Sequence, residues 1–347
     1  MGDRIVGVDI GNDRIRAVEI EHPRKARPSV VRVHEVMLPE GAVKSGEVRE
    51  IRTVATALKR LWSTGGFRSK KVVLGMGNQR VLARDLTVPK MPLVDIRASL
   101  PFQVQDLLPV PVSDAMLDFY PVSESQGDNG PVVHGLLIAA LKEAVNANVE
   151  AVRLAGLTPV EVDLIPFALT RLFATSRAEA VVVVDIGGTT TNVVVAVGGV
   201  PEFVRIIPTG GDEVTQGIAN RLGLELPAAE NLKRTSRIGR AGQQIHPDEL
   251  QAIEVVTESS FDLLSSLRNT VEYYVNARPE HRPTRIVLSG GGAQLTGLPE
   301  ALADLTRIPV IIGNPFEQVT PAKNFAKSTV SPLALSVALG LAVGSAA

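Results

Sequence analysis

The most constraining feature of the sequence is a strand motif that occurs twice, about half the chain length apart. The first copy, RIVGVDIGNDRIRAVEI, contains Asp9, and the second, AVVVVDIGGTTTNVVVAV, contains Asp185. In each copy an apolar run ends in Asp-Ile-Gly, turns, and returns as a second apolar run, which predicts a β-hairpin. Such a repeat indicates an internal duplication, and two copies favour two similar lobes over a solenoid.

Apolar spacing around the two hairpins predicts an α/β fold. After the first hairpin we expect a strand at 29–38, a helix at 51–66 and two further strands before Pro89. After the second we expect a strand in VPEFVRIIPT, several helices, and a strand–glycine turn–helix in TRIVLSGGGAQLTGLPEALADL. Apolar residues at helical spacing predict one long helix from Pro247 to Arg278.

The segment from Pro89 to about Leu157 differs from both halves. It begins with a helical pattern that contains Pro101, which should kink or split the helix. Two strands separated by the polar turn SQGDNGPV follow, and then an amphipathic helix that ends near Gly156. This pattern predicts a small subdomain inserted between the larger halves.

Composition limits the class of protein. The chain has 347 residues, enough for two domains or one bilobal unit, and a net charge of −1, which offers no footprint for nucleic acid. It has no cysteine, which excludes a disulfide framework and a Cys-ligated metal, and its five histidines lack ligand spacing. The first residues do not form a signal peptide, and the apolar tail is shorter than the ~20 residues that span a bilayer. We expect a soluble cytoplasmic protein.

The two hairpin turns have the chemistry of a phosphate site. Glycines bring backbone N–H groups close to an anion, and threonine hydroxyls add donors at the same place. Asp9 and Asp185 would repel phosphate, but Mg²⁺ uses one or two carboxylates together with waters and substrate phosphates. We therefore expect these two residues to hold Mg²⁺ through water. A single Asp-Ile-Gly turn could be an ordinary hairpin, and it is the second copy that favours a ligand.

A third glycine motif, Ser289-Gly290-Gly291-Gly292, follows a predicted strand and precedes a helix. This junction would let a flat ring approach the backbone, although strand–glycine–helix junctions are common. The chain has no G-x-x-x-x-G-K-[ST] loop and no G-x-G-x-x-G after its first strand. Walker-type and Rossmann-type nucleotide binding are therefore disfavoured.

The order DIG, DIGGTTTN, GG and SGGGAQLTGL resembles the actin, hexokinase and heat-shock chaperone superfamily. Three longer segments resemble, more specifically, the PilM family of cytoplasmic actin-like proteins in type IV pilus assembly. They are QDLLPVPVSDAMLDF, IPTGGDEVTQGIANRLGLELPAAENLKR and the ending SPLALSVALGLAVG. The resemblance covers nearly the whole chain.

This resemblance implies a bilobal actin-like fold, a duplicated ribonuclease H-like architecture with subdomains 1A, 1C, 2A and 2B. Subdomain 1C would be the insertion at 89–157. Subdomain 1A would comprise 1–88, 158–178 and 331–347, subdomain 2A would comprise 179–211 and 283–330, and subdomain 2B would comprise 212–282.

The resemblance also implies ATP with Mg²⁺ between the lobes. Asp9 and Asp185 would serve the metal, and Glu230 and Lys233 would lie near the adenosine unless they are a solvated helical pair. The remaining nucleotide-binding positions are Gly11, Asn12, Arg16, Gly187, Gly188, Thr189, Thr190, Asn192, Gly210, Gly211, Gly291 and Gly292.

The sequence departs from the family pattern at three places. Asp13 and Arg14 stand in the first turn, where relatives have small hydroxyl residues, and Arg16 replaces a lysine. Ile165 occupies the position of a water-positioning acidic or amide side chain, and an aliphatic side chain cannot orient water. Asp163 is a candidate substitute. We expect ATP binding with weak or absent hydrolysis.

By the same resemblance, the expected function is docking. The chain would bind the N-terminal cytoplasmic peptide of a PilN-like membrane protein in a groove between subdomains 1A and 1C, at the cytoplasmic face of the inner membrane. Self-association or contact with a pilus ATPase is a further possibility. Two alternatives stay open: a sugar-type kinase, which needs a catalytic base such as Asp163, and an FtsA-like filament-forming protein.

Overall fold

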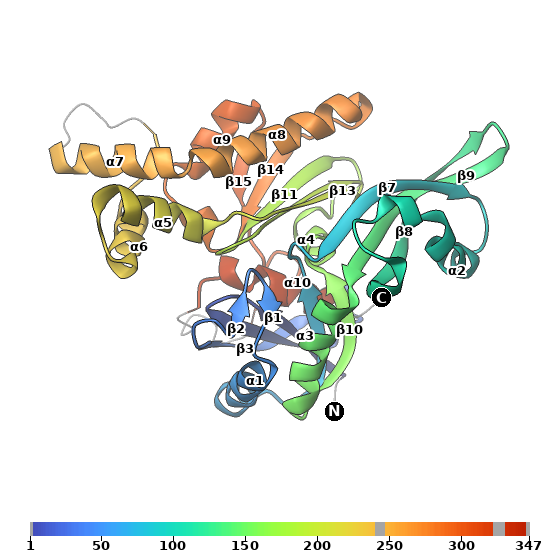
Figure 1. Ribbon diagram of the computed structural model, residues 1–347, viewed down its shortest axis with the longest axis horizontal. Coiled ribbons are helices and arrows are strands. Elements are labelled where there is room, and N and C mark those ends of the chain that lie inside the picture. Colours follow the sequence, from blue (N-terminus) through green and yellow to red (C-terminus); the bar gives the residue numbers. More distant parts are fainter. Residues whose placement is uncertain (1–2, 240–246, 322–329, 345–347) are drawn as a thin grey trace.

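Two five-stranded sheets form the cores of two lobes (Figure 1). The structure is a computed structural model that describes residues 3–239, 247–321 and 330–344. Lobe 1 contains strands in the order β10 (Thr158–Leu164), β6 (Lys71–Met76), β1 (Arg4–Ile10), β2 (Arg14–Glu21) and β3 (Ser29–Met37). Lobe 2 has the order β15 (Val310–Ile312), β14 (Arg285–Ser289), β11 (Ala180–Ile186), β12 (Thr191–Val197) and β13 (Val200–Ile207).

The two sheets have the same topology. In lobe 1, β1, β2 and β3 form an antiparallel meander, and β6 and β10 continue the sheet in parallel on the other side of β1. In lobe 2, β11, β12 and β13 form the meander, and β14 and β15 are the parallel pair. The predicted duplication and both predicted hairpins are thus confirmed.

Two helices join the lobes. Helix α4 (Ile165–Phe173) contacts β11 and β12 of lobe 2, and helix α10 (Ser336–Gly344) packs against α4 and against β1 and β2 of lobe 1. One apolar core contains Val18 of β2, Leu169 of α4 and Val183 of β11. Helices α1 (Ile51–Gly65) and α3 (Lys142–Leu154) pack together and cover the outer face of lobe 1.

The packing of α10 depends on glycine. A Cβ atom added to Gly7 of β1 would lie 1.9 Å from the Ala338 carbonyl oxygen. A Cβ atom added to Gly340 would lie 2.4 Å from the Ala168 carbonyl oxygen of α4. Both are backbone atoms that a rotamer change cannot move. The helix therefore lies against the sheet and α4 at a distance that only glycine permits.

Lobe 2 carries five helices in its described residues (Figure 1). They are α5 (Gly211–Leu222), α6 (Leu226–Thr235), α7 (Pro247–Ser259), α8 (Phe261–Ala277) and α9 (Leu298–Thr306). The single helix predicted over 247–278 is wrong, because it divides at Ser260. At Ser260 the backbone leaves the regular helical values (φ −91°, ψ −7°), and its N–H is shared between the Val256 and Thr257 carbonyls, as is common at helix ends.

A three-stranded unit projects from the lobes (Figure 1), and we call it the insert: β7 (Val81–Pro89), α2 (Leu93–Gln103), β8 (Ala115–Gly127) and β9 (Gly130–Leu141). Its sheet has the order β7-β9-β8, and α2 packs on one face around Leu100, Phe119 and Leu137. Pro101 lies in the last turn of α2 and does not split the helix.

The insert differs at two points from the predicted range 89–157. Strand β7 precedes that range but pairs with β9, and α3 lies inside the range but packs on α1 in lobe 1. The division into four named subdomains stays a prediction. Among the described residues, no helix combines the length and the apolar character needed to cross a bilayer.

Substitution of Gly340 by alanine should lower the free energy of unfolding by about 1–3 kcal/mol, because the new methyl group forces α10 away from α4. Thermal or urea denaturation would measure the change. The control is Gly291→Ala, which adds the same methyl group where no other residue lies within 4 Å. Equal stability of the two variants would contradict the role assigned to this close contact.

Candidate functional site

The carboxyl ends of β1 and β11 bring Asp9 and Asp185 together between the lobes. Burial, reinforced by the nearby Asp9 carboxylate, raises the pKa of Asp185 to about 7. Burial also raises the pKa of Asp9, and the Arg16 guanidinium opposes this shift. The buried Asp185 and the partly buried Asp9, both with raised pKa values, place two carboxylates where a cation would neutralise them.

Three unpartnered polar atoms lie in one row across the lobe 2 sheet. Asp185 pairs in register with Asn192 on β12 and with Ser289 on β14, so the three side chains share a face. Asp185 Oδ1, Asn192 Oδ1 and Ser289 Oγ are buried, and none makes a hydrogen bond of normal geometry in the described part of the chain, although the Ser289 hydroxyl lies close enough to Asp185 to lower its pKa. Buried polar atoms are rarely left unsatisfied, so this row indicates a ligand position.

Lobe 1 closes on this row at the end of β6. A Cβ atom added to Gly77 would lie 2.7 Å from Asn192 Oδ1 and 2.8 Å from Ile165 Cδ1. The site is therefore built from both lobes. Ile165, at the position where the family resemblance implies a water-positioning group, contributes an aliphatic side chain.

The two Asp-Ile-Gly turns are equivalent in structure. The Gly11 N–H donates to the Arg14 carbonyl at 3.0 Å, and the Gly187 N–H donates to the Thr190 carbonyl at 2.9 Å. These two predicted phosphate donors are therefore used within their own turns. The N–H groups of Gly188 and Thr189 have no partner in the described structure and remain able to bind an anion.

Helix α5 begins against the second turn. The Gly211 N–H donates to the Gly187 carbonyl at 2.9 Å, and the Asp212 N–H donates to the Gly188 carbonyl at 2.8 Å. A Cβ atom added to Gly210 would lie 2.4 Å from the Gly188 carbonyl oxygen. Gly210 is thus required for this close approach, whereas a Cβ atom on Gly211 would come no closer than 3.5 Å to its neighbours.

Glu230 and Lys233 lie on α6 and are joined to α5 rather than solvated alone. The Lys233 ammonium donates to the Gly211 carbonyl at 2.8 Å and to Thr215 Oγ1 at 2.7 Å. It also pairs with Glu230 Oε2 at 2.6 Å. The two residues form the helical i,i+3 pair and also lie beside the start of α5, so their place near an adenosine stays a prediction.

The third glycine motif is tightly built except at one position. Gly290 has a positive φ of 84°, and a Cβ atom there would lie 2.4 Å from the Ile186 carbonyl oxygen. A Cβ atom on Gly292 would lie 2.3 Å from Ile186 Cγ2. At Gly291 a Cβ atom would meet no atom within 4 Å. No packing contact requires glycine there, and the open space suits a flat ring on the backbone.

The first turn carries a local charge network. Arg16 lies 3.7 Å from Asp9 Oδ2 and donates to Glu35 at 3.1 Å, and Arg14 bridges Glu35 and Asp13. The Asn12 side chain accepts the Gly46 N–H at 2.9 Å and so holds the short hairpin of β4 (Val43–Lys44) and β5 (Glu47–Val48). Part of the predicted first loop therefore stabilises lobe 1.

Asp163 is engaged elsewhere. Its carboxylate forms an ion pair with Arg171 and accepts the Leu164 N–H, while Arg171 also donates to the Gly340 carbonyl of α10. These contacts give Asp163 a structural role between β10, α4 and α10. A catalytic role for Asp163 stays a prediction.

Two site residues were missed by the sequence interpretation. Ser289 was considered only as the first residue of the third glycine motif, and its position beside Asp185 follows only from strand register. Asp212 lies so close to the second turn that a Cβ atom on Gly188 would be 2.7 Å from its Oδ2. Burial raises the pKa of Asp212, opposed by Lys233. The acidic residue directly after Gly210-Gly211 was the available signal.

The residues present fit a nucleotide with Mg²⁺ better than a protein-held metal. Within the described residues, no group of three or more His, Asp or Glu side chains is placed to hold a metal ion. Mg²⁺ needs only one or two carboxylates when waters and phosphates complete its shell. Asp9 and Asp185, the free N–H groups of the second turn and the open Gly291 match that arrangement.

The architecture is the bilobal actin-like fold. The MreB5 protein of Spiroplasma citri bound to ADP has a TM-score of 0.56 at 11% identity, over 97% of this chain and 94% of that one. The ethanolamine utilization protein EutJ from Carboxydothermus hydrogenoformans has a TM-score of 0.56 at 17% identity, over 99% and 90%. At these identities the likeness shows the fold alone.

Residues 7–346 match the family described as "Type IV pilus assembly protein PilM". The chain belongs to this PilM family and is an actin-like protein of type IV pilus assembly. A solved structure titled "PilM-PilN type IV pilus biogenesis complex" is 28% identical, with a TM-score of 0.83 over 99% of this chain and 98% of that one. The cell division protein FtsA of Pseudomonas aeruginosa is a more distant relative, 25% identical over 91% of this chain and 84% of its own length.

Replacement of Asp185 by asparagine should stabilise the unliganded protein at high pH. The folded state raises the pKa of Asp185 to about 7, so stability falls as pH rises from the unfolded value near 4 through about 7. The variant loses this dependence, and at pH 8 its free energy of unfolding should exceed that of the wild type by up to about 4 kcal/mol. Urea denaturation at pH 5 and pH 8 in a chelator measures it. The exposed Asp118→Asn is the control, and identical pH profiles for wild type and Asp185→Asn would contradict the argument.

Proposed function

We propose that this PilM-family protein binds ATP·Mg²⁺ between its lobes and docks the N-terminal cytoplasmic peptide of a PilN-like membrane protein. Through that peptide it would be held at the cytoplasmic face of the inner membrane. The observation that carries nucleotide binding is the row of buried, unpartnered atoms on Asp185, Asn192 and Ser289, which lies beside a second carboxylate, that of Asp9. Such a site is costly unless a ligand completes it.

Each part of the nucleotide has matching residues. The free N–H groups of Gly188 and Thr189 would bind the phosphates, with the hydroxyls of Thr189 and Thr190 as further donors. Asp9 and Asp185 would hold Mg²⁺ through water, and the metal would neutralise phosphate charge. Other residues would bind the nucleoside: Gly210, Gly211, Glu230 and Lys233 beside the ribose and adenosine, and Gly291 and Gly292 beneath the base.

The site favours binding over turnover. Ile165 contacts the Gly75 and Gly77 positions at the end of β6, where its aliphatic side chain cannot orient an attacking water. Asp163, the candidate substitute and the candidate base of a kinase, is held by Arg171. These contacts support a docking protein with weak or absent ATP hydrolysis over a sugar-type kinase.

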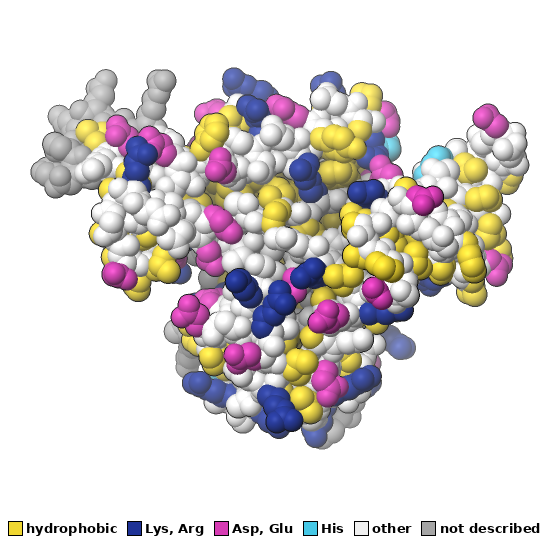
Figure 2. All heavy atoms as spheres, in the orientation of Figure 1, with side chains coloured by type: hydrophobic (Ala, Val, Ile, Leu, Met, Phe, Trp, Pro, Cys, Tyr) yellow, Lys and Arg dark blue, Asp and Glu magenta, His cyan; other side chains and the backbone are white. Residues whose placement is uncertain are grey.

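The insert supplies an apolar docking surface. Val94 and Phe102 of α2 are 75% and 79% exposed. Figure 2 shows hydrophobic side chains gathered over the insert. Large apolar side chains that gather on an exposed surface mark interaction sites. The similar solved complex contains PilN, so the peptide of a PilN-like protein is the partner that we assign to the insert and the adjoining face of lobe 1.

Gly291→Val should weaken ATP·Mg²⁺ binding by tenfold or more while leaving thermal stability unchanged. The branched side chain would occupy the space assigned to the base but meets no protein atom near its Cβ. Isothermal titration calorimetry measures the affinity, and Ala98→Val, which introduces the same valine side chain on the exposed face of α2, is the control. If wild-type protein binds no ATP at millimolar concentration, nucleotide binding is refuted.

Phe102→Ala should weaken binding of the PilN-like N-terminal peptide by about tenfold, because truncation of an exposed aromatic anchor costs 1 kcal/mol or more. Fluorescence anisotropy with a labelled peptide measures the affinity. The matched control is Phe261→Ala, which removes a 66% exposed phenylalanine from α8 in lobe 2. An equal effect of both variants, or of neither, would place the peptide elsewhere.

A further inference from the structure

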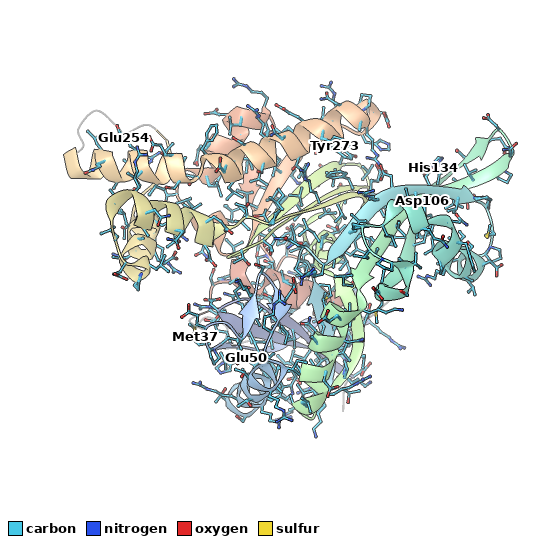
Figure 3. All side chains as sticks on the ribbon, in the orientation of Figure 1. Met37, Glu50, Asp106, His134, Glu254 and Tyr273 are labelled. Atoms are coloured by element: carbon cyan, nitrogen blue, oxygen red, sulfur yellow. The ribbon has the colours of Figure 1, made fainter. Side chains whose placement is uncertain are left out.

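The insert touches lobe 2 through a hollow, polar interface. Strands β7, β8 and β9 all contact β13 of lobe 2. A cavity of about 320 Å³ lies at this interface, lined by Asp85, Thr87 and His134 of the insert and by Glu202, Arg278 and His281 of lobe 2. Figure 3 labels His134 on β9 and Tyr273 on α8, which mark the two sides. Such an interface can open without exposing an apolar core.

One ion pair crosses this hollow interface in the described structure. Arg278 Nη2, directly after α8, lies 2.8 Å from Asp85 Oδ2 of β7. The guanidinium also lies over the ring of Tyr274, 5.5 Å from its centroid. Tyr274 is fully buried and directs its hydroxyl to Glu202 of β13 at 3.4 Å. Lobe 2 therefore holds Arg278 in place, and Asp85 is the part of the contact that the insert supplies.

The other attachment of the insert is apolar and packed. The ring of Tyr120 on β8 lies 4.7 Å from that of Phe167 on α4, and Leu136 of β9 belongs to the core shared by both lobes. Separation at this side would expose buried apolar surface, which is costly. The insert is thus anchored at α4 and fastened at Asp85–Arg278, which is the arrangement of a hinge and a clasp.

The clasp is connected to the candidate nucleotide site through one strand. Glu202 lies on β13, and β13 pairs along its length with β12, including Asn192 opposite Ile206. Asn192 is one of the three unpartnered residues of the site. A ligand that moves β12 relative to lobe 1 would move β13, and with it the lobe 2 side of the clasp.

We propose that the Asp85–Arg278 pair is an inter-lobe clasp that sets the angle between the insert and lobe 2. When the ion pair is formed, it holds the insert in one orientation. When the pair separates, the insert can rotate about the packed contact at α4. Resting on the proposed function, the same clasp couples nucleotide between the lobes to peptide affinity at the insert. Each ligand then shifts the orientation that the other prefers.

Spin-label distances test the clasp without any ligand. The chain has no cysteine, so labels at Gln126→Cys on the insert and Asn276→Cys on α8 report one distance by double electron–electron resonance. Asp85→Asn should broaden the distance distribution, and Asp85→Lys should broaden and lengthen it because the pair becomes repulsive. The control is Asp118→Lys, which disrupts an exposed ion pair with Arg97 inside the insert. An unchanged distribution in Asp85→Lys, or the same change in the control, would overturn the clasp.

Peptide affinity with and without ATP·Mg²⁺ tests the coupling. In the wild type the two affinities should differ, and Asp85→Asn should reduce their ratio by about two- to fivefold, the range expected of an exposed ion pair. A ratio unchanged in Asp85→Asn would overturn the coupling. If wild-type protein binds no nucleotide, the proposed function fails while the label distances still decide whether the clasp exists.

Discussion

The structure depends on the close packing of α10 and α4 between two copies of one sheet. Gly7 and Gly340 let the backbone of α10 lie against β1 and α4 at distances that no side chain would allow. This packing joins the lobes into one apolar core around residues such as Leu169 and Val183. Because both sheets are tied to these helices, the carboxyl ends of β1 and β11 meet, and with them the two Asp-Ile-Gly turns.

Where the two turns lie together, several buried polar atoms are left without hydrogen bonds. The buried Asp185 lies near the partly buried Asp9, and the atoms beside Asp185 on Asn192 and Ser289 have no partner in the described chain. Such an arrangement lowers the stability of the unliganded protein, and a bound ligand that satisfies these groups compensates for that cost. The residue that faces this site from α4 is Ile165, whose aliphatic side chain cannot orient a water molecule.

The insert adds a second kind of contact to this core. Its apolar attachment at Tyr120 and Phe167 resists separation, while its polar contact with lobe 2 encloses a cavity and is closed by Asp85 and Arg278. Apolar packing contributes more free energy than an exposed ion pair. The contact at Tyr120 and Phe167 is therefore the pivot, and the contact at Asp85 and Arg278 is the side that moves. The exposed phenylalanine on α2 is carried by this unit.

The sequence by itself determined the duplicated hairpins, the α/β class and most of the residues around the candidate site, because strand periodicity and Asp-Ile-Gly turns are local signals. It could not determine that Gly11 and Gly187 use their N–H groups within their own turns, that Asp163 is held by Arg171, or that Ser289 lies beside Asp185. Those facts depend on strand register and on contacts between residues far apart in the chain. The break at Ser260 and the assignment of β7 to the insert were decided in the same way, by hydrogen bonds and pairings that form only in the folded protein.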